Sequence, residues 1–392
     1  MVPDWLVWIA VCIVAVVVFE VFRAGQLLFR NLRTEPKLEA ANPTRSEGPY
    51  PLVSVIIPAK DEESFIERSI RSVLDSDYPN LELIVVNDRS NDQTGRIISD
   101  LSRTDPRVKA LHIKELPDGW TGKTHALFRG AEPARGDIFL FTDADTILRS
   151  DVISLAVKYF AKHKLDMLGL LPGFIERGFS ENVVYAHLAL GLSFFYPLTD
   201  VNDPGKSAGL ASGSFIMISR DAYHTIGTWE RLKNEITEDV ALGKLVKARG
   251  LRLTVARGPD LVNTRGFASV PAVFRFWKRT FYGGLEKSVR KTLRLAVNYT
   301  TLNLLPIFLV GSTVALFMGD NRPCLWLLLV LSACGMVLVI AAYSYFLHKE
   351  RAHWAYGLTA PLGIALSAWV ALGTLLTLLG NEGIRWRGST YR

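Results

Sequence analysis

The sequence predicts an α/β domain with a mostly parallel sheet, together with α-helical transmembrane segments. Two observations predict this architecture. Between residues 51 and 267, short apolar runs rich in β-branched residues alternate with helical stretches, as in βα units. Outside that region, four stretches lack the charged residues that interrupt the rest of the chain. The length of 392 residues exceeds that of one average domain, so it accommodates both parts.

The composition excludes several classes of protein. A hydrophobic content of 49% beside 21% charged residues excludes a disordered chain. The cysteines all lie inside apolar runs, which excludes a disulfide framework and a cysteine zinc site: Cys12, Cys324 and Cys334. The 45 Lys and Arg and 38 Asp and Glu residues must lie in water, so the apolar residues are expected to be concentrated elsewhere. This balance fits a membrane protein with a large aqueous domain.

The four apolar stretches are residues 5–19, 297–318, 324–347 and 354–380. A helix rises about 1.5 Å per residue and a bilayer core needs about 20 apolar residues. The last three stretches are long enough to cross, and the first becomes so when it continues past Glu20 to Phe22. Buried core helices are the alternative, but such helices rarely avoid charged residues over so many positions. We therefore expect four membrane segments.

The charges beside these stretches predict their orientation. Asp4 precedes the first stretch, and four cations follow it: Arg23, Arg30, Arg33 and Lys37. The positive-inside rule then places the polar domain in the cytoplasm of a multi-pass protein of the inner (plasma) membrane. Because Asp4 occupies the place of a basic signal-peptide region and no small-residue cleavage site follows, the first stretch is expected to be a permanent anchor.

The end of the chain fits this orientation less well. Cations after the third stretch lie on the cytoplasmic side as expected: His348, Lys349 and Arg351. Those of the tail would lie outside if residues 354–380 cross once: Arg385, Arg387 and Arg392. Pro361 and Gly363 offer a second possibility, because a re-entrant pair of segments broken there would return the tail to the cytoplasm.

Residues 271–296 have the pattern of an amphipathic helix at the membrane interface. Apolar residues recur every three or four positions: Phe274, Trp277, Phe281, Leu285, Val289 and Leu293. Cations lie between them: Arg275, Lys278, Arg279, Lys287, Arg290, Lys291 and Arg294. Such a helix binds anionic headgroups and sinks its apolar face to the acyl boundary. A solvated helix packed on the domain is the alternative. No nucleic-acid-binding motif is present, so the bilayer and not nucleic acid is the predicted partner.

Acidic residues follow three predicted strands of the polar domain. The strands are residues 52–58, 81–86 and 137–141, and the acids that follow include Asp61 and Glu62, Asp88 and Asp92, and Asp143 and Asp145. Open α/β sheets bind ligands outside the carboxyl ends of their strands. The acids are therefore expected to share one edge of the sheet and to form a site.

Asp143 and Asp145 have the spacing of a metal site. Two carboxylates with few other ligands suit Mg²⁺ or Mn²⁺, which usually shares phosphate oxygens of the substrate. The alternative for Asp145 is an Asx turn before the helix beginning near Ser150. Asp88 is a candidate to accept a hydrogen bond from a base or ribose. The alternative, which does not exclude this role, is an Asx turn at Asp88 that caps the helix from about Thr94 with the help of Asp92.

Two helix starts supply further candidates. No Walker sequence and no G-x-G-x-x-G follows these strands, so metal and cations must handle any phosphate. Lys123, at a predicted helix start, is a candidate to reach a diphosphate, and a solvated lysine is the alternative. Thr237 is expected to cap a helix with Glu238 and Asp239 in its first turn, where the macrodipole favours ionised carboxylates. A general base and a simple cap both fit these acids.

Several motifs together resemble the family 2 glycosyltransferases, inverting enzymes of the GT-A (Rossmann-like) fold that use nucleotide-activated sugars. Residues 55–63 are similar to the family's opening strand and loop, with Asp61 where asparagine is usual, and residues 86–94 resemble its nucleotide-contacting loop. Asp143-Ala144-Asp145 resembles its D-x-D motif, and Thr237-Glu238-Asp239 its E-D motif. The resemblance implies Asp239 as general base with Glu238 beside it, and Asp143 and Asp145 at the metal. It further implies donor contacts at Pro58, Ala59, Asp61, Glu62, Asp88, Lys123 and Asp143, and Gly213 on the acceptor side.

Among membrane members, the arrangement is similar to the ceramide-glucosyltransferase-like and the hopanoid- or carotenoid-associated groups. Residues 116–123 resemble the hopene-associated group, and residues 384–391 the ending of lipid-modifying members. The Q-x-x-R-W motif of many members is absent, since Val273 and Phe276 stand at its first two defined positions before Trp277. Arg275 or Arg279 is the candidate replacement for the missing cation. This departure, and the small number of membrane segments, argue against a processive polymerase.

The expected organisation is an anchor at residues 1–24, a linker at 25–49, a cytosolic GT-A domain at 50–270, the interfacial helix at 271–296, transmembrane segments at 297–380 and a basic tail at 381–392. The expected activity is transfer of a sugar from a nucleotide sugar, with uracil as the family's usual base, to a lipid or polyprenoid hydroxyl. The alternatives are a processive polysaccharide synthase and an inactive membrane scaffold. A transporter is disfavoured, because such proteins carry ionisable groups within their spans.

Overall fold

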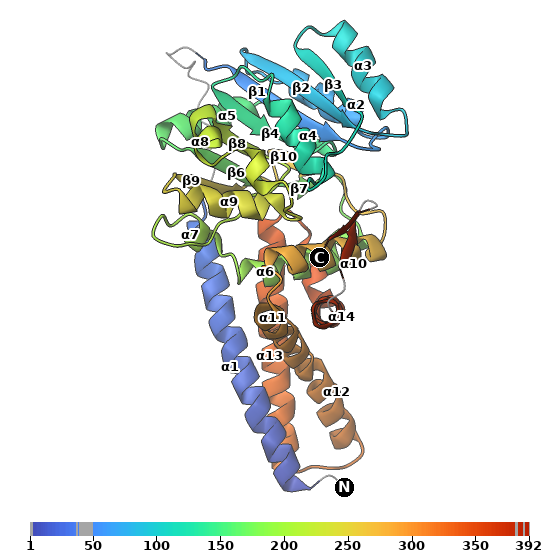
Figure 1. Cartoon of the computed structure of the whole chain (residues 1–392). Helices are drawn as coiled ribbons and strands as arrows, with labels where there is room; N and C mark the ends of the chain where they lie inside the picture. Colours follow the sequence, from blue (N-terminus) through green and yellow to red (C-terminus); the bar gives the residue numbers. More distant parts are fainter. Residues whose placement is uncertain (1–2, 37, 39–49, 381–382, 387–388, 392) are drawn as a thin grey trace. The chain divides into compact units, whose positions relative to one another are not determined.

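A computed structural model describes residues 3–36, 38, 50–380, 383–386 and 389–391. The chain forms two compact units. The sheet unit contains residues Glu35–Glu176 and Tyr196–Gly266, and the helical unit contains Met1–Thr34, Arg177–Phe195 and Phe267–Arg392. Figure 1 labels the elements of both units.

The main sheet of the sheet unit has the strand order β3-β2-β1-β4-β8-β6-β9. Its strands are β1 (Val53–Ala59), β2 (Leu81–Asp88), β3 (Val108–Ile113), β4 (Ile138–Phe141), β6 (Met167–Leu171), β8 (Ile216–Ser219) and β9 (Leu253–Arg257). The first four strands of this order are parallel to one another, whereas β8 runs antiparallel to both β4 and β6. The three predicted strands and the mixed α/β class are confirmed. A smaller sheet has the order β5-β10-β7, with β5 (Thr146–Leu148), β7 (Gly173–Phe174) and β10 (Val262–Thr264).

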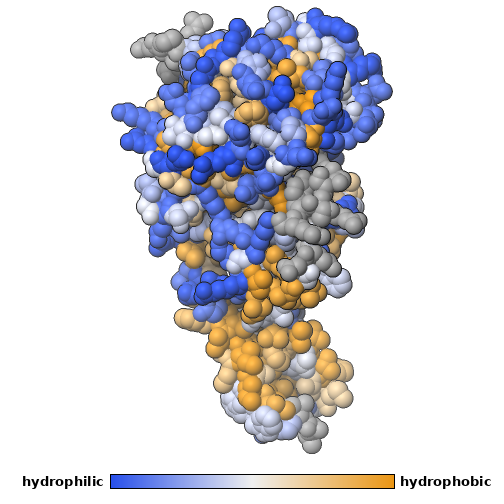
Figure 2. Space-filling view, viewed as in Figure 1, coloured by the Kyte–Doolittle hydropathy of each residue, from blue (hydrophilic) through white to orange (hydrophobic). Residues whose placement is uncertain are grey.

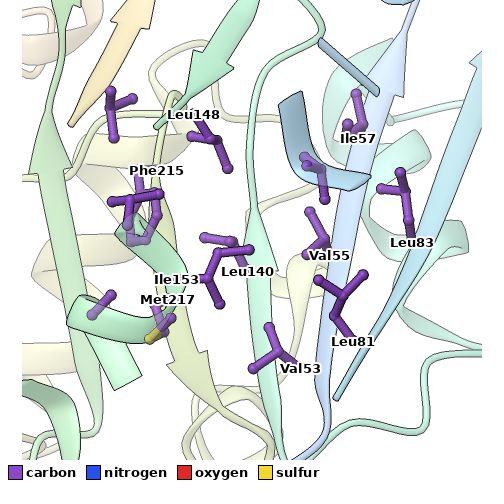
Figure 3. Packing of buried hydrophobic residues seen from close by; sticks show 14 of the residues in the cluster. Val53, Val55, Ile57, Leu81, Leu83, Leu140, Leu148, Ile153, Phe215 and Met217 are labelled. Atoms are coloured by element: carbon purple, nitrogen blue, oxygen red, sulfur yellow. The ribbon is translucent and has the colours of Figure 1, made fainter. Parts of the chain in front are cut away.

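Helices cover both faces of the main sheet. The helices are α2 (Ile66–Leu74), α3 (Thr94–Thr104), α4 (Gly122–Ala131), α5 (Val152–Lys162), α7 (Leu198–Val201), α8 (Arg220–Thr225), α9 (Glu238–Ala248) and the 3₁₀ helix η2 (Trp229–Leu232). On one face, Val53, Val55 and Ile57 of β1 pack in one core with residues of α2, α3 and α5 (Figure 3). On the other, Gly130 of α4 lies against Ile56. Because both faces of β1 are covered, the strand is apolar almost throughout.

A buried carboxylate lies near the start of β2. Glu82 accepts hydrogen bonds from the hydroxyl of Ser54 (2.7 Å), the ammonium of Lys109 (2.6 Å) and the backbone N–H of Arg135 (2.6 Å). Burial raises the pKa of Glu82, but these hydrogen bonds outweigh it and lower the pKa to about 2. The carboxylate therefore joins β1, β2, β3 and the start of β4 as a charged group.

The helical unit contains α1 (Asp4–Thr34), the π-helix η1 (Ser180–Tyr185), α6 (Ala186–Ser193), α10 (Val270–Gly284), α11 (Val289–Leu302), α12 (Leu304–Phe317), α13 (Pro323–Lys349), the 3₁₀ helix η3 (Trp354–Thr359) and α14 (Ala360–Leu379), with the short strands β11 (Ile384–Trp386) and β12 (Ser389–Tyr391). Within the described residues, four helical stretches are long and apolar enough to cross a membrane: Asp4–Thr34, Val289–Phe317, Pro323–Lys349 and Trp354–Leu379. Helices α1 and α12 both pack along α13 (Figure 1). In Figure 2 hydrophobic residues cover much of the lower part of this bundle, above a paler tip.

The helical unit differs from two expected boundaries. Helix α1 continues to Thr34, so the expected linker at 25–49 begins inside a helix. The expected interfacial helix at 271–296 is two helices, because Glu286 and Lys287 adopt positive φ values of 60° and 52° and end the first. Trp277, which the sequence assigned to the acyl boundary, is instead buried inside the unit. Lys37, Arg387 and Arg392, used in the charge argument, lie outside the described residues.

Candidate functional site

The loops that follow β1 and β2 hold each other through reciprocal hydrogen bonds. The N–H of Asp61 donates to the Ser90 hydroxyl (3.0 Å), and the N–H of Asn91 donates back to the Asp61 carboxylate (2.8 Å). Asp61 and Arg89 both have positive φ values, 53° and 54°, which cost energy in residues other than glycine. A second reciprocal pair joins Glu63 to the same loop, at Asp92 and Gln93. The two loops therefore form one rim at the carboxyl ends of the strands.

Asp88, the last residue of β2, is buried and paired with Arg89, whose Nε lies 2.7 Å from the carboxylate. Gly122, the first residue of α4, lies directly beside this pair. A Cβ atom at Gly122 would stand 2.5 Å from Asp88 Oδ2 and 3.0 Å from Arg89. Only a glycine therefore lets α4 approach Asp88 this closely, which connects the β2 loop to the start of α4.

Lys123 joins two of the predicted site segments. Its Nζ lies 2.6 Å from Asp143 Oδ1, beyond β4, and 2.6 Å from Glu238 Oε1, in the first turn of α9. The predicted helix start is confirmed, and Thr121 caps it by accepting a hydrogen bond from the N–H of Thr124. Burial lowers the pKa of Lys123, but Asp143, Glu238 and Asp239 outweigh it and hold the pKa above its usual value. The ammonium is therefore the counter-ion of this acidic cluster.

Gly213 completes the cluster from the segment before β8. Its N–H donates to Asp239 Oδ2 at 3.3 Å. A Cβ atom there would stand 2.5 Å from Lys123 Nζ and 2.7 Å from Asp143 Oδ2. The absence of a side chain at Gly213 thus allows the ammonium and both acidic segments to meet.

Asp145 lies next to this cluster, but its negative charge is less well balanced by neighbouring cations than that of Asp143. The Thr264 hydroxyl donates to its Oδ1 at 3.3 Å. Burial, then the charges of Asp143 and Glu62, raise its pKa to about 6. Glu62 is itself paired with Arg265, at 2.9 Å. Asp145 is thus a carboxylate in a site with excess negative charge.

The chemistry of this donor set fits a divalent cation. Within the described residues no three His, Cys, Asp or Glu side chains are arranged to hold a metal by themselves. Mg²⁺ and Mn²⁺ sites commonly use one or two carboxylates and take the remaining oxygens from a bound phosphate. A cation at Asp143 and Asp145 would also relieve the repulsion that raises the pKa of Asp145.

Helix α9 differs from the expected capping arrangement. Thr237 stands at the N-cap, but its side chain makes no cap hydrogen bond. Instead Asp239 Oδ1 accepts from the N–H of Val240 at 2.8 Å, while Glu238 is buried and faces Lys123. Asp92, in contrast, accepts from the N–H of Thr94 as expected of a cap.

The match to known families is consistent with this geometry. The model of glycosyl transferase family 2 matches residues 54–227. These residues form a family 2 glycosyltransferase domain. The 4,4'-diaponeurosporenoate glycosyltransferase of Staphylococcus aureus (strain USA300) is 27% identical over 293 residues, which cover 72% of this chain and 74% of that protein.

A solved structure supports the fold of the glycosyltransferase domain. The mannosyltransferase PcManGT from Pyrobaculum calidifontis, in complex with GDP-Man and Mn²⁺, superposes with a TM-score of 0.50 at 19% identity. The match covers 93% of this chain and 99% of that one. The expected GT-A fold is therefore confirmed.

The glycosyltransferase domain brings most predicted residues to one sheet edge. Pro58 and Ala59 end β1, and Ala59 pairs in register with Asn87, immediately before Asp88. The remaining donor, metal and catalytic candidates lie on the adjoining loops and helix starts described above. Trp277, Arg275 and Arg279 lie on α10 of the helical unit, where the Arg279 guanidinium lies 5.4 Å from the centre of the Phe276 ring.

Several residues around the site were not predicted. Arg89 and Arg265 supply cations to Asp88 and Glu62, and Gly122 permits the approach of α4. Trp120, in a segment singled out only for its resemblance, places its ring against His125 and Phe128 of α4. For Arg89 and Gly122, the signal available in the sequence was their position beside motif residues. Arg265 had none, because it reaches Glu62 across a separation of 203 residues.

Proposed function

We propose that this chain transfers a sugar from a nucleotide-sugar donor, with UDP-sugars the first candidates, to the hydroxyl of a lipid or polyprenoid acceptor at the cytoplasmic face of the membrane. One observation carries the proposal. Lys123 gathers Asp143 and Glu238 at the carboxyl ends of the strands, with Asp239 held beside them by Gly213. Four apolar helices and the name of the S. aureus relative support an apolar acceptor held in a membrane.

The reaction is a single displacement that inverts the anomeric centre. Asp143 and Asp145 would hold Mg²⁺ or Mn²⁺, which offsets the charge of the leaving diphosphate. Asp88 and the rim formed by the β1 and β2 loops bind the nucleoside. Lys123 donates hydrogen bonds to the diphosphate from its position between Asp143 and Glu238.

Asp239 takes the proton of the acceptor hydroxyl. Its Oδ2 accepts a long hydrogen bond, 3.3 Å, from the N–H of Gly213, and its Oδ1 accepts one of 2.8 Å from the N–H of Val240. A carboxylate oxygen has more than one lone pair, so Oδ2 retains the capacity to accept a proton. The start of α9 favours the ionised form, which a base requires.

The central test incubates the membrane-reconstituted protein with labelled sugar nucleotides and extracted lipids, and identifies the product by mass. A single added hexose on a lipid is expected. Long polymer products would instead identify a processive synthase, and no product with any donor would favour a scaffold. Excess chelator is expected to abolish transfer, and Mn²⁺ or Mg²⁺ to restore it. Full activity in excess chelator would refute the metal assignment.

Asp239→Asn tests the base. Removing a general base typically lowers the rate by about 10²- to 10⁴-fold. Asp221→Asn is the matched control, because Asp221 also lies in the first turn of a helix, α8, and is exposed. Unchanged transfer by folded Asp239→Asn protein would exclude the role.

The name of the S. aureus relative supports a second acceptor class. Diaponeurosporenoate is named as a carboxylate. An ionised carboxylate carries no proton to remove, so transfer to such an acceptor needs no general base. Asp239→Asn protein would then keep most of its activity toward an apolar carboxylate and lose it toward an apolar alcohol, which separates the two acceptors in one experiment.

A further inference from the structure

Helix α14 has the length and hydropathy of a membrane-spanning helix, but its packing partners differ from those of the other spans. Its residues Ile364, Ala368, Val370 and Ala371 belong to one buried cluster with residues of η1, α6, α10 and α11. Helices α1, α12 and α13 form a second cluster, to which α14 contributes its first residue, Ala360. In the candidate span Trp354–Leu379, which contains α14, half of the most apolar segment is buried inside the protein, more than in any other candidate span of the described residues.

The direction of α14 also differs from that of the bundle. Figure 1 shows α1 and α13 along their lengths, whereas α14 is seen end-on in the same view. All three helices belong to the helical unit. If α1 and α13 cross the bilayer, α14 therefore runs across them, along the membrane plane.

The charges of its partners fix the depth of α14. Helix α14 packs along α11 and against α10. The exposed Arg275 lies on α10, and the exposed Arg290 and Arg294 lie in the first two turns of α11. A cation at the bilayer centre costs roughly 2.5–3.5 kcal/mol on insertion scales. These helix segments therefore lie at the membrane surface, and α14 must lie at the same level.

The exposed side of α14 is a single apolar stripe. Its large exposed residues recur at heptad spacing: Leu362, Trp369, Leu372, Leu376 and Leu379. Polar side chains lie on the opposite, buried face: Ser367, Thr374 and Thr377. On α11, exposed Val289, Leu293 and Val297 form a similar row next to Arg290 and Arg294. Apolar rows beside cations match the boundary between acyl chains and anionic headgroups.

We propose that α14 lies flat in one leaflet with this stripe toward the acyl chains, so that the chain crosses the membrane three times. Asp4 and Arg322, 2.5 Å apart, mark one side of the membrane. Arg177 and Glu350, 3.7 Å apart, mark the other, at the far end of α13. The tail after α14 then stays on the side of Glu350, where the positive-inside rule favours its arginines. The bilayer surface is the partner of the stripe, whichever sugar or acceptor the domain uses.

Spin labels at three positions of the stripe test the orientation. Leu362→Cys, Trp369→Cys and Leu376→Cys are introduced singly into a chain whose native cysteines are replaced, and the label depth is measured in vesicles containing anionic lipid. A flat helix gives three equal, shallow depths. A crossing helix would separate the first and last labels by about 21 Å along the normal, since 14 residues rise about 1.5 Å each. Either that gradient or a maximum at the middle position, as in a re-entrant loop, would overturn the proposal.

A second measurement leaves α14 unchanged. A cysteine appended after Arg392, Ala352→Cys and Asn321→Cys are labelled singly with a membrane-impermeant maleimide from each side of sealed vesicles. We expect the tail cysteine to react from the same side as Ala352→Cys and from the side opposite to Asn321→Cys. Reaction of the tail together with Asn321→Cys would overturn the proposal. Both readouts are independent of sugar transfer, so the proposed activity can fail without affecting them.

Discussion

Replacing Asp145 by asparagine should stabilise the metal-free glycosyltransferase domain while abolishing its activity. Burial and the charges of Asp143 and Glu62 raise the pKa of Asp145 from 3.8 to about 6. A carboxyl group with a raised folded-state pKa contributes stability below pH 4, and this contribution is lost as the pH rises through about 6. At pH 8 the wild-type protein therefore carries an unfavourable charge that Asp145→Asn removes.

The size of the effect follows from the shift. The difference between 3.8 and about 6 corresponds to about 3 kcal/mol, and the partial exposure of the side chain makes about 1–3 kcal/mol the reasonable range. For a domain of this size, each kcal/mol moves the unfolding temperature by about 2–4 °C. We expect a rise of several degrees at pH 8 in chelator, which disappears at pH 4.

The assay is thermal unfolding of the purified full-length protein across pH, with and without Mn²⁺. Mn²⁺ should stabilise the wild type more than Asp145→Asn, because the variant lacks one of the two proposed ligands. Asp100→Asn is the control, since the ion pairs of Asp100 with Arg96 and Arg103 on α3 are exposed and contribute little. A variant that is less stable than the wild type at pH 8, or a stabilisation that persists unchanged at pH 4, would refute the reasoning.

Three further predictions concern the same unit. Lys123→Met should destabilise it, because Asp143 and Glu238 lose their shared cation. Since Lys123 and Asp143 are about one third exposed, we expect a loss of about 1–3 kcal/mol, below the range for a fully buried pair. Denaturant unfolding measures this loss, and a neutral result would contradict the bridging role. Gly213→Ala should abolish transfer activity, because the added Cβ would stand 2.5 Å from the Lys123 ammonium. Gly205→Ala is the control and should retain activity, because its added Cβ would stand 3.3 Å from its nearest neighbour, a side-chain oxygen of Asp203. The carboxyl of Glu82 has a lowered pKa of about 2, so its contribution to stability is present above its usual pKa of 4.5 and lost as the pH falls toward 2. Glu82→Gln should therefore destabilise the protein at pH 7 and much less at pH 2, and equal losses at both pH values in chemical unfolding would contradict this.

The sequence was sufficient to locate the strands that carry the site, because buried parallel strands are continuous apolar runs. Strands β1, β2 and β4 lie where the apolar pattern placed them, and α3 begins at Thr94, where a capped helix start was expected. The acids after these strands meet at one edge because parallel strands share a carboxyl end. Periodicity alone could not show the antiparallel insertion of β8 beside β4, since strand direction depends on the path of the intervening chain.

The ion pairs of the site were beyond prediction from the sequence. Lys123 was expected to face a phosphate, and nothing in its local segment indicated Glu238, which lies over 100 positions away. Similarly, the regular apolar spacing of residues 271–296 predicted one helix, whereas the chain turns at Glu286 and Lys287. A periodic pattern reports which face is apolar, but it does not report whether lipid or protein covers that face.

The reciprocal hydrogen bonds between Asp61, Ser90 and Asn91 have a consequence for engineering the proposed donor site. Each of the two loops supplies the backbone geometry on which the other depends, so transplanting one alone from another transferase would leave unmatched amides on both. The two loops should therefore be exchanged together, as one structural unit. For the proposed nucleotide-sugar donor, a change of nucleotide would then require a coordinated replacement of both loops rather than a series of point substitutions.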